Sequence, residues 1–145
     1  MSNLSNNFIA GDWIAGHSSI SNINPSDTHD VIGEYAQASK SQLKEALNSA
    51  QIAQKQWLAT GLEQRQAVLM KIGEEMMARS AELGELLSRE EGKPLAEGKG
   101  EVYRAGQFFT YYAAEVLRQS GDTADSVRPG IEVDVRREPM GTVAI

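Results

Sequence analysis

The sequence predicts a helix-rich α+β chain in which a central helical region is flanked by short β-strands. Apolar residues recur with helical spacing between residues 41 and 120. Turn-forming residues dominate the first 40 positions, and alternating apolar residues return after position 121. Of the 145 residues, 41% are hydrophobic and 23% are charged, which is compatible with a packed core.

The N-terminal region, residues 1–40, is expected to contain strands and turns. The pairs Phe8-Ile9 and Trp13-Ile14 flank Ala10-Gly11-Asp12, which favours a tight hairpin. Asn before Pro in Asn24-Pro25-Ser26-Asp27 is typical of a turn. Residues 31–36 follow as a second strand.

The first helix of the region 41–120 shows one continuous apolar face, spaced three or four residues apart. Its members are Leu43, Ala46, Leu47, Ala50, Ala53 and Trp57. Thr60 and Glu63 have the spacing of a capping box, which predicts that a second helix starts there. Ser80 is expected to cap a third helix.

Gly92 and Pro94 predict the end of that third helix, because glycine tolerates a left-handed backbone and proline cannot continue the helix. A last helix runs from about Pro94 to Gly121 and contains Gly98, Gly100 and Gly106. An interior glycine costs about 1 kcal/mol relative to alanine. The three glycines therefore indicate a kink, tight helix packing, or the close approach of a ligand.

The C-terminal region, residues 121–145, returns to strand patterns. Ile131, Val133 and Val135 alternate with charged residues, which predicts a strand with one solvated face. Residues 141–145 form a continuous apolar run, as in a strand buried on both faces of a parallel sheet. A chain that stops in such a strand is expected to be part of a longer protein.

Charge and composition exclude several classes of function. The net charge of -6 argues against a nucleic-acid partner. No apolar run reaches the ~20 residues that cross a bilayer, and no secretory leader is recognisable, so we expect a cytoplasmic protein without a membrane partner. Cysteine is absent, which removes disulfides and a thiol nucleophile, and only two histidines are present.

Three further motifs remain weak. Gly98-Lys99-Gly100 lies in a predicted helix and lacks the strand–turn–helix context of a dinucleotide-binding loop. Glu90, Glu91, Glu97 and Glu101 are compatible with paired acid–base carboxylates or, more simply, with a solvated helix face. Aromatic residues at 108–112 favour core packing or a pocket wall, because no basic residues are interleaved with them.

A set of motifs in fixed order resembles the opening part of the aldehyde dehydrogenase family. They are Phe8 to Trp13, Ile23 to Asp27, Val31 to Gly33, Trp57, Arg65 to Ile72, Glu91 to Pro94, Glu101, Tyr111 to Ala113 and Arg137 to Gly141. Residues 86–94 and 126–135 are most similar to dehydrogenases of α-ketoglutarate semialdehyde (2,5-dioxovalerate) and related carboxylated semialdehydes.

The resemblance implies an α/β fold for the complete protein and the NAD- or NADP-dependent oxidation of an aldehyde. It covers only the first part of a family member, so the catalytic Cys, Glu and Asn are missing. The chain alone is therefore expected to have no catalytic or cofactor-binding residues and to be inactive. In the resemblance, residues 121–145 correspond to an oligomerisation strand and the first strand of the NAD(P)-binding domain, and a homo-oligomer is implied.

Two groups of site residues follow from the resemblance alone. Gly100 and Arg104 match positions that line the substrate tunnel. Asn22, Ile23 and Glu90 match a monovalent-cation site, although family members often have Asp at the last position. The alternative hypothesis is a stand-alone helical interaction module without catalysis. An ordinary surface role for Arg104, paired with Glu101 or Gln107, also stays open.

Overall fold

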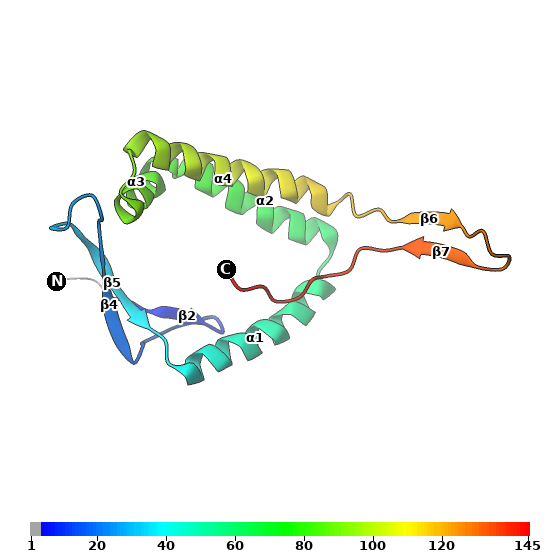
Figure 1. Cartoon of the computed structure of the whole chain (residues 1–145), viewed down its shortest axis with the longest axis horizontal. Helices are drawn as coiled ribbons and strands as arrows, with labels where there is room; N and C mark the ends of the chain where they lie inside the picture. The colour runs from blue at the N-terminus through cyan, green and yellow to red at the C-terminus, as the bar shows by residue number, and fades with distance from the viewer. Residues whose placement is uncertain (1–3) are drawn as a thin grey trace.

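A computed structural model describes residues 4–145, which form a helix-rich α+β frame of four helices and seven short strands (Figure 1). This confirms the predicted fold class of the chain. The strands are β1 (Leu4–Ser5), β2 (Asn7–Ile9), β3 (Asp12–Ile14), β4 (Ser18–Ile23), β5 (Val31–Gln37), β6 (Asp122–Asp125) and β7 (Glu132–Val135). The helices are α1 (Lys40–Ala59), α2 (Leu62–Ala78), α3 (Ser80–Glu91) and α4 (Leu95–Val116). Residues 1–3 of the expected N-terminal region lie outside the described residues.

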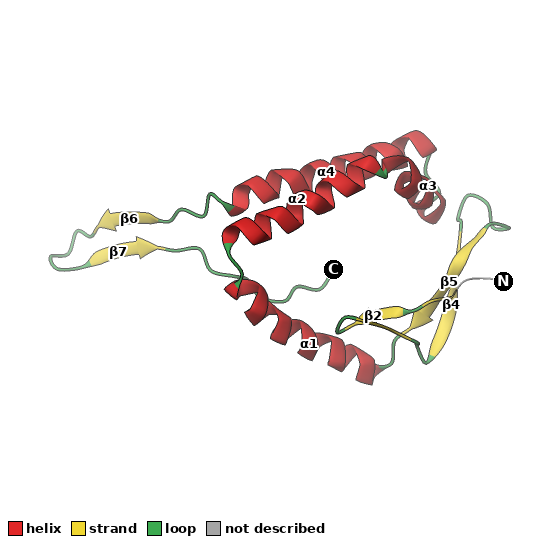
Figure 2. Cartoon of the chain, turned by 180° about the vertical axis from the view of Figure 1, so that it is seen from behind, coloured by secondary structure: helices red, strands yellow, loops and turns green. Residues whose placement is uncertain are grey.

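The strands form three small sheets (Figure 2). The largest has the order β1-β5-β4, with β1 parallel and β4 antiparallel to β5. The predicted hairpin is confirmed, because Phe8 pairs with Trp13 across β2 and β3. The predicted strand around Val133 is also present, and it pairs with β6, a strand that the sequence analysis did not predict.

Helices α2 and α4 pack side by side, and α3 packs against the N-terminal half of α4 (Figure 1). Glycines allow this close approach. A Cβ atom on Gly106 would lie 2.7 Å from the carbonyl oxygen of Gly73. A Cβ atom on Gly98 would lie 2.5 Å from the carbonyl oxygen of Gly84. Helix packing thus accounts for two of the three glycines in α4, which runs without a break from Leu95 to Val116.

Helices α2 and α3 begin close to the expected positions, but both predicted caps are wrong. Thr60 is not the cap of α2; its hydroxyl donates to the carbonyl of Trp57 at 2.6 Å and so closes α1. The N-cap of α2 is Gly61, which makes no side-chain hydrogen bond. Ser80 is the first residue of α3 rather than its cap. The capping box of this chain lies at Ser39, whose side chain accepts from the backbone N–H of Gln42.

The helix ends agree better with prediction. Gly92 has φ 72 and ends α3 in the left-handed conformation expected of a glycine there. Pro94 is the N-cap of α4. However, α4 ends at Val116 and not near Gly121.

Residues 141–145 differ from the expected buried strand. They have no regular secondary structure, are largely exposed, and pair with no strand among residues 4–145. A strand needs a neighbour to satisfy its backbone hydrogen bonds, and none is adjacent here.

The core of the described residues is small. The buried apolar side chains are Ile9, Ala36, Val102 and Ala113, and the buried polar one is Ser88. Many large apolar side chains remain exposed, among them Leu43 and Leu47 of α1 and Val133 of β7. Within residues 4–145, none of the helices combines the length and apolarity that crossing a membrane requires.

Candidate functional site

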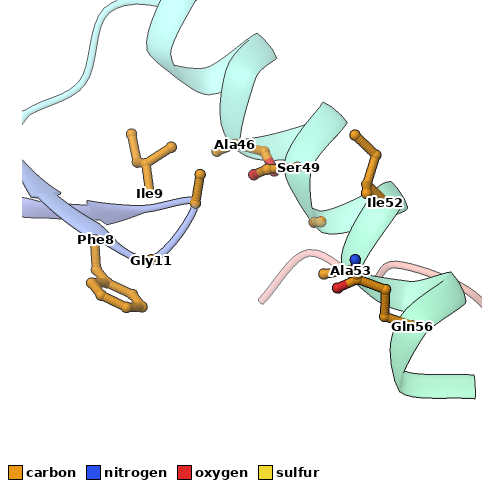
Figure 3. A pocket seen from close by; sticks show the side chains of 10 residues that line it. Phe8, Ile9, Gly11, Ala46, Ser49, Ile52, Ala53 and Gln56 are labelled. Carbon is orange, nitrogen blue, oxygen red and sulfur yellow. The ribbon is translucent and has the colours of Figure 1, made fainter. Parts of the chain in front are cut away.

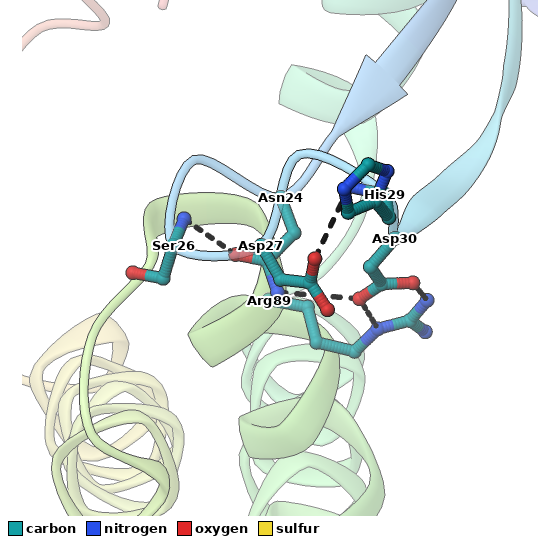
Figure 4. A network of polar contacts seen from close by, with 6 residues as sticks. All are labelled: Asn24, Ser26, Asp27, His29, Asp30 and Arg89. Carbon is teal, nitrogen blue, oxygen red and sulfur yellow. Dashed lines mark hydrogen bonds and ion pairs between the residues drawn. The ribbon is translucent and has the colours of Figure 1, made fainter.

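The turn between β4 and β5 docks onto the C-terminal end of α3 (Figure 4). Asn24 shapes this turn, because its side-chain oxygen accepts from the backbone N–H of Ser26 at 2.9 Å. Its amide nitrogen donates to Asp30 Oδ2 at 3.2 Å. The predicted Asn-Pro-Ser-Asp turn is therefore confirmed, and its side chains also position the acid that follows.

Asp30 and Arg89 form a bidentate ion pair that joins the turn to α3. Arg89 Nε lies 2.8 Å from Asp30 Oδ2, and Arg89 Nη2 lies 2.6 Å from Oδ1. Hydrogen bonds from Arg89 and then from Asn24 lower the pKa of Asp30 from 3.8 to about 2. The same hydrogen bond raises the pKa of Arg89. Two parallel charged hydrogen bonds fix orientation as well as distance.

Gly92 completes the junction. The hydroxyl of Ser26 donates to the carbonyl of Gly92 at 2.7 Å. A Cβ atom at Gly92 would lie 2.5 Å from that hydroxyl oxygen and 2.9 Å from Pro25 Cγ. Only glycine therefore satisfies both the left-handed backbone and the close contact with the turn.

This junction brings together two of the three residues expected at a cation site. Asn22 Nδ2 donates to Glu90 Oε1 at 2.8 Å, although 68 residues separate them. Ile23 follows Asn22 in β4, at a bulge opposite Val31. Among the residues that the structure describes, no three His, Cys, Asp or Glu side chains gather in the way a metal cluster would require. Any cation here would depend on the Glu90 carboxylate with backbone and amide oxygens.

Lys93 forms a second ionic cluster, at the turn between α3 and α4. Its ammonium lies 2.6 Å from Glu101 Oε2 and also pairs with Glu91. The side chain of Lys93 is only 17% exposed, whereas that of Glu101 is 55% exposed. Hydrogen bonds from Lys93 to Glu101 and then to Glu91 raise the pKa of the ammonium. Two of the four glutamates weighed as acid–base groups are thus engaged by Lys93.

The two expected tunnel residues, Gly100 and Arg104, lie one turn apart on the exposed side of α4. A Cβ atom on Gly100 would meet nothing within 4 Å. Arg104 Nη1 donates to Gln107 Oε1 at 3.2 Å, and its guanidinium carbon lies 5.5 Å from the ring centre of Phe108. Within residues 4–145, no carboxylate lies within ion-pair distance of Arg104. Glu101 and Gln107 are the two surface partners considered for Arg104, and its side chain contacts the neutral one, Gln107.

Among the aromatic residues at 108–112, Phe109 is partly buried, whereas the other three do not form core. Phe108, Tyr111 and Tyr112 are all more than half exposed. The two tyrosine rings lie edge to face, with their ring centres 5.2 Å apart. They present an aromatic surface on the same helix as Arg104.

An apolar hollow lies between the β2–β3 turn and α1 (Figure 3). Phe8 and Ile9 line it from the hairpin, and Ala46, Ala50 and Ala53 line it from α1. The periodicity of α1 predicted this apolar face, but the sequence did not indicate that the hairpin would lie opposite. The hollow has no titratable side chain in its wall.

Sequence reasoning missed the Asp30–Arg89 pair and the Lys93–Glu101 pair. The first joins residues 59 positions apart, and no local pattern connects them. The second had a usable signal, because Lys93 follows the Gly92 turn and Glu101 lies on the helix that starts after it.

Comparison with known proteins gives a family match that covers most of the chain. The sequence profile of the aldehyde dehydrogenase family matches residues 13–145. The curated 2,5-dioxopentanoate dehydrogenase of Saccharolobus solfataricus is 33% identical over 138 residues, covering 94% of this chain and 29% of that protein. This confirms the resemblance to α-ketoglutarate semialdehyde dehydrogenases that the motifs predicted.

Solved structures agree with the sequence comparison. A crystal structure of an aldehyde dehydrogenase from Brucella melitensis is 32% identical with a TM-score of 0.85, covering 93% of this chain and 28% of that one. A NAD-dependent benzaldehyde dehydrogenase from Corynebacterium glutamicum is 31% identical with a TM-score of 0.79, covering 91% of this chain and 29% of that one. The chain thus spans less than a third of the length of the proteins that it matches.

Proposed function

This chain belongs to the aldehyde dehydrogenase family, and we propose that it contributes the N-terminal part of an enzyme that oxidises an aldehyde to the acid with NAD or NADP. The observation that carries this proposal is the family match over residues 13–145. The similarity to a NAD-dependent benzaldehyde dehydrogenase supports a nicotinamide cofactor. The complete enzyme would have the α/β fold of the family.

The chemistry of such an enzyme needs parts that this chain does not contain. In such an enzyme a thiolate would add to the aldehyde carbon and water would later release the acid from the thioester, while a bound nicotinamide cofactor would supply the hydride acceptor. The sequence has no cysteine, so it does not supply the nucleophile. Its role would be structural support and one wall of the substrate path.

For the substrate, we favour a carboxylated semialdehyde. A relative is named for 2,5-dioxopentanoate, which carries a carboxylate distal to its aldehyde. Arg104 offers a planar guanidinium suited to such a carboxylate. Its partners in the structure, Gln107 and Phe108, leave its charge without a counter-ion among residues 4–145. Open space over Gly100 gives a ligand access to the same helix face.

We also propose a monovalent-cation site at the junction between β4 and α3. Contact between Asn22 and Glu90 supports it, with Ile23 as a backbone neighbour. A monovalent cation would be bound chiefly by oxygen atoms and would tolerate the low charge of this set. The cytoplasmic location and the homo-oligomeric state also stay predictions.

A first experiment tests the activity itself. The longest protein product that contains this sequence is purified and assayed with 2,5-dioxopentanoate and with pentanal, using NAD and NADP in turn. Reduction of either cofactor at the expense of aldehyde is expected. No turnover with any aldehyde would refute the proposed function and favour the alternative of a helical interaction module, which the family match does not support.

A second experiment tests the clamp. Arg104→Met should lower kcat/KM for the carboxylated substrate. The loss of transition-state stabilisation should be about 1.5–3 kcal/mol, the worth of a charged hydrogen bond. Pentanal, which has no carboxylate, should be oxidised almost as before. Arg118→Met serves as the matched control, because Arg118 lies just beyond α4 and pairs only with Glu115 among the described residues. Equal losses of kcat/KM on both substrates would show that Arg104 does not bind the substrate carboxylate.

A further inference from the structure

The surroundings of Arg104 along α4 contain one acidic competitor for its charge. Side chains three or four residues apart share a helix face, so the neighbours of Arg104 are residues 100, 101, 107 and 108. Three of them are a glycine, a glutamine and a phenylalanine. The fourth, Glu101, precedes Arg104 by three residues, a spacing at which acid and arginine commonly pair.

The structure does not form that pair. Glu101 is instead held by Lys93 at 2.6 Å, and Arg104 turns to Gln107 at 3.2 Å. Lys93 is well placed to keep Glu101. Gly92 turns the chain back in the left-handed conformation, and Pro94 fixes the start of α4 immediately afterwards. The lysine side chain is also mostly enclosed, which limits its alternatives.

We propose that Lys93 is a positioning residue for substrate specificity, which acts by holding Glu101 away from Arg104 and so keeps the guanidinium free for the substrate carboxylate. This inference rests on the proposed role of Arg104. Without Lys93, Glu101 would be released to pair with Arg104, and an incoming carboxylate would have to displace it. Substrates without a carboxylate would not meet this competition.

The expected effect is modest, because Glu101 would compete as an exposed helix pair. Such pairs contribute a few tenths to about 1 kcal/mol, which corresponds to a roughly two- to five-fold change in affinity. We therefore expect Lys93→Met to lower kcat/KM for 2,5-dioxopentanoate by roughly two- to five-fold and to leave pentanal unchanged.

A double-mutant cycle tests this in the longest product that contains the chain. The variants are Lys93→Met, Glu101→Gln and the two combined, with Lys71→Met on α2 as the control for losing a lysine charge. The ratio of the two kcat/KM values, carboxylated over uncharged, is the readout. The combined variant should regain the wild-type ratio, because the competitor is removed with its holder.

Each outcome decides the proposal. The proposal is supported if Lys93→Met lowers the ratio of the two kcat/KM values and the added Glu101→Gln substitution returns it to the wild-type value. Equal losses on both substrates, or no recovery in the combined variant, would mean that Lys93 only stabilises the α3–α4 turn. If Lys93→Met does not fold, Glu101→Gln alone is informative, since its ratio should stay at the wild-type value or above and a fall would overturn the idea. Arg104→Met separates the two levels: if it leaves the ratio intact, the clamp itself fails.

Discussion

The contact between α2 and α4 gives a sharp test, because two glycines of α4 have opposite surroundings. A methyl group on Gly106 would lie 2.6 Å from Met77 Cγ and 2.7 Å from the backbone oxygen of Gly73. A methyl group on Gly100 would meet nothing within 4 Å. Substitution by alanine should therefore destabilise the chain at the first position and stabilise it at the second.

The magnitudes follow from two terms. Replacing a helix-interior glycine by alanine gains about 1 kcal/mol of helix propensity. Overpacking costs about 1–3 kcal/mol, and the upper half applies when the obstacle is backbone, which has no other rotamer to adopt. We expect Gly106→Ala to lose about 1–2 kcal/mol net and Gly100→Ala to gain about 0.5–1 kcal/mol.

Urea unfolding of the purified chain, followed by far-ultraviolet circular dichroism, measures both changes as shifts of the midpoint at constant slope. Gly106→Ala should move the midpoint down and Gly100→Ala should move it up. The pair serves as its own control, since both changes add one methyl group to the same helix. Equal shifts of the two variants, in either direction, would refute the close contact between α2 and α4.

Three other predictions concern the chain alone. Because the pKa of Asp30 is lowered from 3.8 to about 2, its ion pair with Arg89 should stabilise the fold fully above about pH 4 and be lost as the pH falls towards 2. The stability difference between wild type and Asp30→Asn should shrink over that range, and a constant difference would contradict the assignment. The chain should oxidise no aldehyde and bind neither NAD nor NADP tightly; turnover above a blank without protein would contradict this. It should also self-associate through its exposed apolar surface, so light scattering at rising concentration should show a growing mass rather than a constant monomer.

Local patterns predicted most of the elements. The hairpin at Phe8 to Ile14, the turn at Asn24 and the helix end at Gly92 depend on neighbours in sequence, and all three are present. The error at Thr60 is also local. Its spacing to Glu63 fits a capping box, but the same hydroxyl is within reach of the carbonyl of Trp57, which needs a donor at the end of α1.

Long-range features could not be derived in this way. Nothing near Asp30 in the sequence indicates Arg89, and nothing near Asn22 indicates Glu90. Gly98, Gly100 and Gly106 look alike in sequence, yet only the neighbouring helices show that two are packed and one is open. Residues 141–145 have the composition of a buried strand, but a strand also requires a partner, which composition does not provide.

Helix α1 has a consequence for how the chain comes apart. It contributes no buried residue in the described structure, and its main contact with another element is with the short strand β2. In proteins most helical stability comes from the packing of an apolar face against other elements, and α1 has little such packing. Because α1 shares few contacts with α2, α3 and α4, we expect it to open at a lower free-energy cost than those helices need to separate. We therefore expect the backbone of α1 to become accessible to proteases before that of α2, α3 and α4.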